Sequence, residues 1–161
     1  MTARIAAVGL AALLGAWALL RFVYVPCQCN AGVTAADLGS GLAEETAGDY
    51  DRLLRARRNL ELLAGLRERC ATDVRVPMLT GANLELLGRP DDALASYGDA
   101  LKIDQRPEIY VEMARLQLQL GQTDAAVSSY VAAARFNPRL MDHFFEEDLR
   151  RRIMEQLDAR P

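Results

Sequence analysis

The sequence has few of the residues that catalytic and nucleic-acid-binding sites require. Among 161 residues there are one histidine, three cysteines and a single lysine, Lys102, and aromatic residues make up only 6%. Three cysteines are too few for a disulfide-dense mini-protein. The net charge is −3 and no basic patch interleaves with aromatic residues, which argues against nucleic-acid binding. No catalytic, phosphate-loop or zinc-protease motif is present, so we expect no enzyme, cofactor, metal site or small-molecule substrate.

Glycine and proline are also scarce, at 11 and 6 residues, which excludes a collagen-like chain and argues against a disordered one. Runs of β-branched residues are few, which argues against a large β-sandwich. Alanine and leucine dominate instead, with 26 and 25 residues. Together with arginine and glutamate these are good helix formers, so we predict an all-α fold.

An apolar run begins the chain. Residues 5–25 carry no charge except Arg21, and at ~1.5 Å per residue they would extend about 31 Å as a helix, enough to span a bilayer. We therefore predict a transmembrane anchor, or uncleaved signal, at residues 1–25. Two alternatives stay open: a secretory signal cleaved after Ala16-Trp17-Ala18, and a lipoprotein modified at Cys27.

Charge predicts how this anchor would be oriented. Arg4 lies on its short side, and no basic residue follows Arg21 in the next 30 positions. The positive-inside rule then gives a single-pass protein of a bacterial inner membrane with a periplasmic C-terminal domain. Small residues spaced four apart could pack this helix against another membrane helix, although alanine-rich helices show such spacing by chance; they are Ala7, Ala11 and Gly15.

Residues 26–48 are expected to form a linker with a short helix beginning near Thr34. Cys27 and Cys29 form a C-x-C pair within it. The pair could be a strained disulfide, half of a metal site, or one end of bridges to another chain. Cys70 occupies an apolar position of a helical pattern and is expected to be buried packing.

Residues 49–161 read as a helical domain that contains an internal repeat. Residues 88–104 and 121–137 match at an offset of 33 positions. In each copy a glycine is expected to turn the chain between two antiparallel helices, with small alanines allowing close approach and a tyrosine packing inside. The matched pairs are Gly88/Gly121, Asp91/Asp124, Ala93/Ala126, Tyr97/Tyr130 and Ala100/Ala133.

This pattern resembles the tetratricopeptide repeat, with units at 74–106 and 107–139. The first helices keep a small residue, Gly81 or Ala114, but Pro77 and Tyr110 stand where the family has tryptophan. The resemblance implies stacked helical hairpins. Two units are few for such an array, so we expect both flanks to cap it, with a helix at 49–70 and another at 146–158.

The resemblance also implies protein–protein binding in a groove lined by the first helix of each unit. Met78 and Ala82 stand where the family's carboxylate clamp has polar residues, which excludes that role. We predict an accessory or scaffold subunit of a larger membrane complex. One alternative is a tethered chaperone or assembly factor for client polypeptides. Another is an enzyme or metal carrier that uses Cys27 and Cys29, with Cys70 or His143 as a further ligand. The groove positions are Arg75, Met78, Ala82, Glu85, Leu86, Glu108, Val111, Arg115, Leu118 and Gln119.

Overall fold

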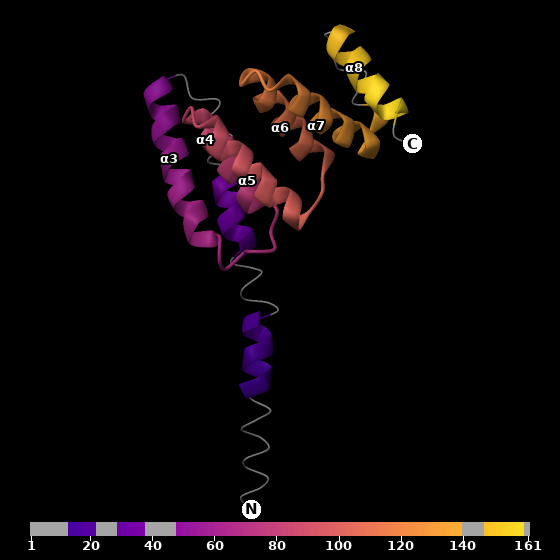
Figure 1. Ribbon diagram of the computed structural model, residues 1–161. Coiled ribbons are helices and arrows are strands. Elements are labelled where there is room, and N and C mark those ends of the chain that lie inside the picture. The colour runs from indigo at the N-terminus through magenta and orange to yellow at the C-terminus, as the bar shows by residue number, and fades with distance from the viewer. Residues whose placement is uncertain (1–12, 22–28, 38–47, 140–146, 160–161) are drawn as a thin grey trace, which may run out of the picture.

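The computed structural model describes residues 13–21, 29–37, 48–139 and 147–159, and every regular element in these parts is helical. Two short helices occupy residues 13–21 and 29–37. The remaining helices follow in the order labelled in Figure 1: α3 (Asp49–Leu66), α4 (Arg75–Leu86), α5 (Pro90–Ile103), α6 (Pro107–Gln119), α7 (Thr123–Phe136) and α8 (Glu147–Asp158).

Two repeat glycines turn the chain as predicted. Gly88 and Gly121 have φ values of 68° and 72°, in the left-handed region that disfavours side chains. After α4, the Gly88 amide donates to the Glu85 carbonyl at 2.9 Å and the Arg89 amide to the Leu84 carbonyl at 2.9 Å. The turn after α6 has the same bonds. This pair of bonds satisfies the last carbonyls of a helix and directs the chain back as an antiparallel partner.

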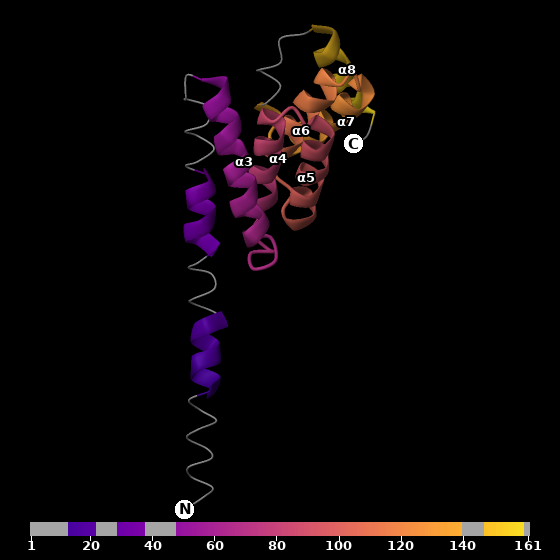
Figure 2. The same ribbon diagram turned by 90° about the vertical axis from the view of Figure 1, so that its left-hand side faces the viewer.

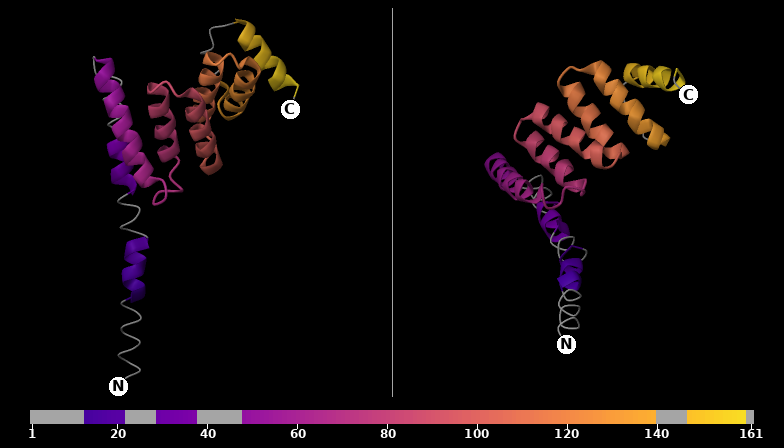
Figure 3. Two further views of the ribbon diagram at one scale, coloured as in Figure 1. Left: turned by 60° about the vertical axis from the view of Figure 1, so that its left-hand side comes forward. Right: turned by 60° about the horizontal axis from the view of Figure 1, so that its bottom comes forward.

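The hairpins stack side by side, in the order α4/α5 and then α6/α7 (Figures 1 and 3). Each core is completed by the next element in the chain. Ile109 and Leu116 of α6 are fully buried in the cluster formed by α4 and α5. Ile153 of α8 is likewise buried in the cluster formed by α6 and α7. The helix α8 therefore covers one end of the array.

The other end is covered by a helix that lies within the expected linker. Residues 29–37 run beside α3 (Figure 2), and their Val33 and Ala36 side chains are 0% exposed. Two buried asparagines join this helix to its neighbours. Asn59 donates to the Ala36 carbonyl at 3.2 Å and to Asn83 Oδ1 at 3.3 Å. Residues 29–37 and α3 thus form a further hairpin, and α3 alone is not the end of the array.

The prediction of a transmembrane anchor at residues 1–25, and of a single-pass inner-membrane location, is wrong. Where the structure describes the chain, no helix combines the length and the apolar character that crossing a bilayer demands. The described helix at residues 13–21 covers only about 14 Å at ~1.5 Å per residue. Gly15 lies on it, and a Cβ atom added there would meet nothing within 4 Å. Ala7 and Ala11 lie outside the described residues.

Candidate protein-binding surface

The ten predicted groove positions lie on α4 and α6 in matching places. Five belong to each helix, and the two sets are related by the 33-residue offset. At ~100° per residue the five positions of one helix fall within one broad face. We call these ten side chains the groove face, because they follow the same side of two consecutive first helices.

The groove face has a half-buried apolar centre. Met78 packs against the cluster of α4 and α5, while Val111 and Leu118 pack against the cluster of α6 and α7. Ala82 and Leu86 are also half-buried. These side chains contribute to the core and still present part of their surface. The exposed members are polar: Arg75, Glu108, Arg115 and Gln119.

An ion pair between Glu85 and Arg115 joins the two helices across this face. Glu85 is 14% exposed and also accepts a 2.7 Å hydrogen bond from the Tyr97 hydroxyl. Arg115 donates a second bond to Glu112 at 3.0 Å. Burial and the Glu85 hydrogen bond both raise the pKa of Tyr97. Burial acts to lower the pKa of Arg115, but its hydrogen bonds to Glu85 and Glu112 outweigh that and raise it. Two groove positions therefore hold the repeats together.

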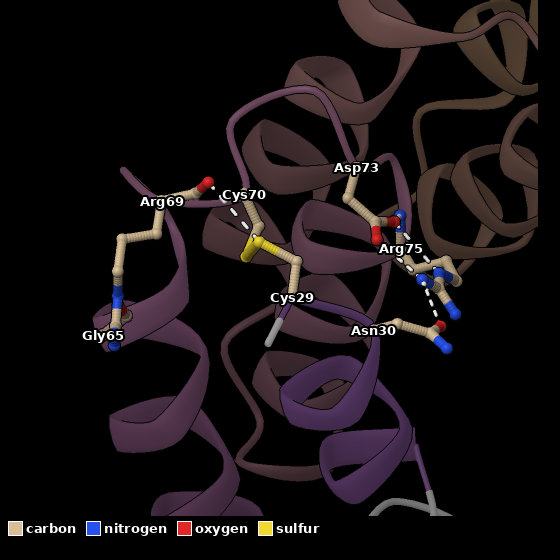
Figure 4. The surroundings of a disulfide bond; sticks show 7 residues. All are labelled: Cys29, Asn30, Gly65, Arg69, Cys70, Asp73 and Arg75. Atoms are coloured by element: carbon tan, nitrogen blue, oxygen red, sulfur yellow. Dashed lines mark hydrogen bonds and ion pairs between the residues drawn. A yellow bond between two sulfur atoms is a disulfide. The ribbon is translucent and has the colours of Figure 1, made fainter. Parts of the chain in front are cut away.

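The N-terminal end of the groove face is fixed by a salt bridge. Arg75 Nη2 lies 2.7 Å from Asp73 Oδ2, and Arg75 Nε lies 3.0 Å from Asp73 Oδ1. The same guanidinium donates to Asn30 Oδ1 at 3.2 Å (Figure 4). The hydrogen bond from Arg75 holds the pKa of Asp73 below its ordinary value. Arg75 is thus positioned by the loop before α4 and by the helix at residues 29–37.

A disulfide between Cys29 and Cys70 lies beside this cluster (Figure 4). Their Cα atoms are 5.6 Å apart, within the range that a disulfide spans. Cys29 is therefore not bonded to Cys27, which rules out one of the three alternatives left open for the C-x-C pair. Cys70 is buried as expected, at 5% exposed, and in addition forms the disulfide. The antiparallel course of residues 29–37 and α3 brings the start of one helix to the end of the other. Cys27 itself lies outside the described residues.

The same geometry removes the basis of the metal-carrier alternative. Both Cys29 and Cys70 are bonded to each other, and disulfide sulfurs are not thiolate ligands. Across the described ranges, His, Cys, Asp and Glu nowhere gather in a group of three that could hold a metal ion. His143 lies outside those ranges. A cavity of about 500 Å³ next to the disulfide is lined by charged groups that include the Asp73–Arg75 and Asp104–Arg106 pairs.

Several residues that shape this surface were not predicted from the sequence. Asn30 and Asp73 orient Arg75, and the Asn59–Asn83 contact fixes α3 against α4. A signal existed for one of them, since Asp73 stands two residues before the start of α4, where side-chain acceptors often bind helix amides. The Arg75 amide does donate to Asp73 Oδ1 at 3.1 Å.

Comparison with known proteins places the fold. No family model matches the chain, and no curated protein matches its sequence. Among solved structures, the TPR protein TTC0263 of Thermus thermophilus is similar, with 23% identity, a TM-score of 0.65, and coverage of 89% of this chain and 69% of that one. The type III secretion chaperone SycD of Yersinia enterocolitica, in complex with a peptide of the translocator YopD, is also similar. It has 20% identity, a TM-score of 0.53, and coverage of 78% and 92%. The described part of the chain therefore has a TPR-like fold.

Proposed function

We propose that the chain is a protein–protein interaction module that binds a partner polypeptide along the groove face, as an accessory or scaffold subunit of a larger complex. The observation that supports this is the matched placement of partly exposed apolar side chains on α4 and α6, bordered by exposed polar ones. A surface of this kind suits binding, since apolar anchors surrounded by a polar rim are typical of interfaces.

The Glu85–Arg115 pair adds to this proposal by fixing the distance between the two helices. Glu85 also holds the Tyr97 hydroxyl, so the pair is supported from inside the fold. A rigid groove loses less conformational entropy when a partner binds than a mobile one does. Recognition then depends on Ala82, Leu86 and Leu118 at the centre, with Arg75 and Gln119 at the two ends.

Site-specific photo-cross-linking tests the proposal in cells of the source organism. A benzophenone amino acid at Ala82 should capture one discrete polypeptide, which mass spectrometry then identifies. The matched control has the same amino acid at Ser128, an exposed position on α7 outside the groove face. Equal capture from both positions, or from Ser128 alone, would show that the groove face is not the binding surface.

The captured partner then allows an affinity test with purified proteins. Ala82→Arg places a long charged side chain in the centre of the groove face and should weaken binding at least 10-fold. Ser128→Arg introduces the same side chain at the control site and should leave the affinity unchanged. Circular dichroism and thermal unfolding of both variants should match those of the parent protein, which separates loss of binding from loss of fold.

A second candidate is a chaperone or assembly factor that holds client polypeptides before they assemble. It is favoured by the fold shared with SycD, whose structure includes a peptide of its translocator. The two candidates differ in whether the chain is still bound once the complex is assembled. A scaffold subunit remains in the mature complex, whereas a chaperone binds the unassembled client and is absent from the product. Size-exclusion chromatography of the native complex with the captured partner distinguishes them.

A further inference from the structure

A cavity of about 440 Å³ opens between α3, α4 and α5. Its α4 wall contains Pro77 and Thr80, and its α3 wall contains Leu60 and Ala64. At ~100° per residue, Thr80 lies on roughly the opposite side of α4 from Met78 and Ala82. The cavity is therefore separate from the groove face. Its volume lies in the range of ordinary ligand sites, and its lining is mostly apolar.

The second repeat carries two aromatic rings at positions equivalent to residues of this cavity. At the 33-residue offset, Pro77 corresponds to Tyr110, and Ile103 at the cavity rim corresponds to Phe136. The rings of Tyr110 and Phe136 stack, with centroids 6.1 Å apart and planes inclined by 20°. The first repeat has no ring at either position. The cavity thus lies where the neighbouring repeat places two aromatic rings.

The rim of the cavity carries a local excess of positive charge. Asp99 Oδ1 accepts from Lys102 Nζ at 2.7 Å, and Asp99 Oδ2 lies 3.0 Å from Arg67 Nη2. All three residues line the cavity, so two cations share one carboxylate. The hydrogen bond from Lys102 holds the pKa of Asp99 below its ordinary value, so the carboxylate stays ionised to a lower pH than a free aspartate does. One positive charge remains uncompensated.

We propose that this cavity binds an aromatic side chain of a partner polypeptide whose flanking residues are acidic. The ring takes the place that Tyr110 and Phe136 occupy in the second repeat, and stacking against apolar walls suits a flat side chain. The flanking carboxylates meet Arg67 and Lys102 at the rim. The site is distinct from the groove face and does not rest on the function proposed above.

The probe is the peptide acetyl-Glu-(5-fluoro-Trp)-Glu-amide, titrated with the full-length protein and observed by fluorine NMR. We expect saturable broadening or shift of the fluorine signal, together with amide shifts at Thr80 and Ser96, which line the cavity. Acetyl-Lys-(5-fluoro-Trp)-Lys-amide should bind more weakly at low salt. This difference should vanish near 1 M salt, where the Debye length is about 3 Å.

Variants that copy the second repeat fill the cavity from within. Pro77→Tyr combined with Ile103→Phe should weaken binding of the acidic probe at least 10-fold while raising the melting temperature. Thr80→Met copies Met113 and serves as an independent filling variant if the first does not fold. Undiminished binding in a folded filled variant, or no binding of the acidic probe by the parent protein, would overturn the site. Equal binding of the acidic and basic probes at low salt would overturn the proposal that the flanking residues of the partner are acidic.

Discussion

Tyr97 connects the inside of the first repeat to the surface between the repeats. Its ring packs against Gly81 of the facing helix, and its hydroxyl donates to Glu85, which pairs with Arg115 of the next repeat. The second repeat differs at two of these positions. Leu118 stands at the place equivalent to Glu85, and Ala114 stands where the first repeat has glycine. The close approach of ring and helix is therefore specific to the first repeat.

This difference predicts the effect of Gly81→Ala. A Cβ atom at position 81 would lie 2.8 Å from Tyr97 Cε1 and 2.9 Å from Cζ. A retreat of the ring would strain its 2.7 Å hydrogen bond to Glu85. We expect the resulting overpacking to cost about 1–3 kcal/mol of unfolding free energy, which outweighs the gain of about 1 kcal/mol in helix propensity. Urea unfolding followed by circular dichroism measures the net change.

Gly98→Ala is the matched control for this prediction. Gly98 lies inside α5, and an added Cβ meets no atom within 4 Å. The same substitution should therefore stabilise the protein by about 0.5–1 kcal/mol. Stabilisation by both substitutions would mean that the Tyr97 ring moves freely and that its bond to Glu85 does not hold it in place.

Among the elements, the helix at residues 29–37 depends most on a single covalent link. It is short, and helices of this length are marginal without tertiary support. Its buried Val33 and Ala36, the Asn59 hydrogen bond and the Cys29–Cys70 disulfide together hold it against α3. The disulfide closes a loop between residues 41 positions apart. Loss of this link should therefore act on the helix first.

We predict that Cys29→Ser combined with Cys70→Ser lowers the unfolding free energy by about 4 kcal/mol, the loop-entropy value for a loop of this length. Hydrogen exchange should accelerate most at residues 29–37 and in the second half of α3, with α6 and α7 little changed. Cys27→Ser is the control, since it removes a cysteine without touching the bonded pair. Equal acceleration along the whole chain would contradict the local role of the disulfide.

The elements also show which parts of the fold could be predicted from the sequence. The turns at Gly88 and Gly121 were predictable because their geometry depends on neighbouring residues alone. The partner of Cys29 was not, because it depends on the path of residues 29–37 back along α3. The predicted anchor failed for a related reason. A run of apolar residues gives only the greatest length that a helix could have, and the helix that the structure describes within this run covers residues 13–21.

At the scale of the whole molecule, the helical hairpins form a linear array in which the apolar side chains of each hairpin pack against the next element. The matching placement of the ten groove positions could be predicted because the 33-residue repeat fixes equivalent faces of α4 and α6. The sequence did not indicate that Glu85 and Arg115 would pair with each other, since that contact crosses between repeats. The cavity between α3, α4 and α5 was not predicted from the sequence either. The one related feature of the sequence is Pro77, which lines the cavity and stands where the family has the larger tryptophan.

In a linear array each repeat contacts only its neighbours, so a destabilising substitution at one end should affect nearby helices more than distant ones. Ile153 of α8 is 0% exposed and packs in the cluster of α6 and α7, while the adjacent Met154 is 44% exposed. Ile153→Ala should cost about 2–5 kcal/mol, and Met154→Ala should change stability by less than about 0.5 kcal/mol. Hydrogen exchange of Ile153→Ala should rise in α7 and α6, less in α5, and least in α3, which the disulfide holds. Uniform acceleration from α3 to α8 would instead mean that the chain unfolds as one cooperative unit, in which case the groove face and the cavity would be lost together and could not be tuned separately.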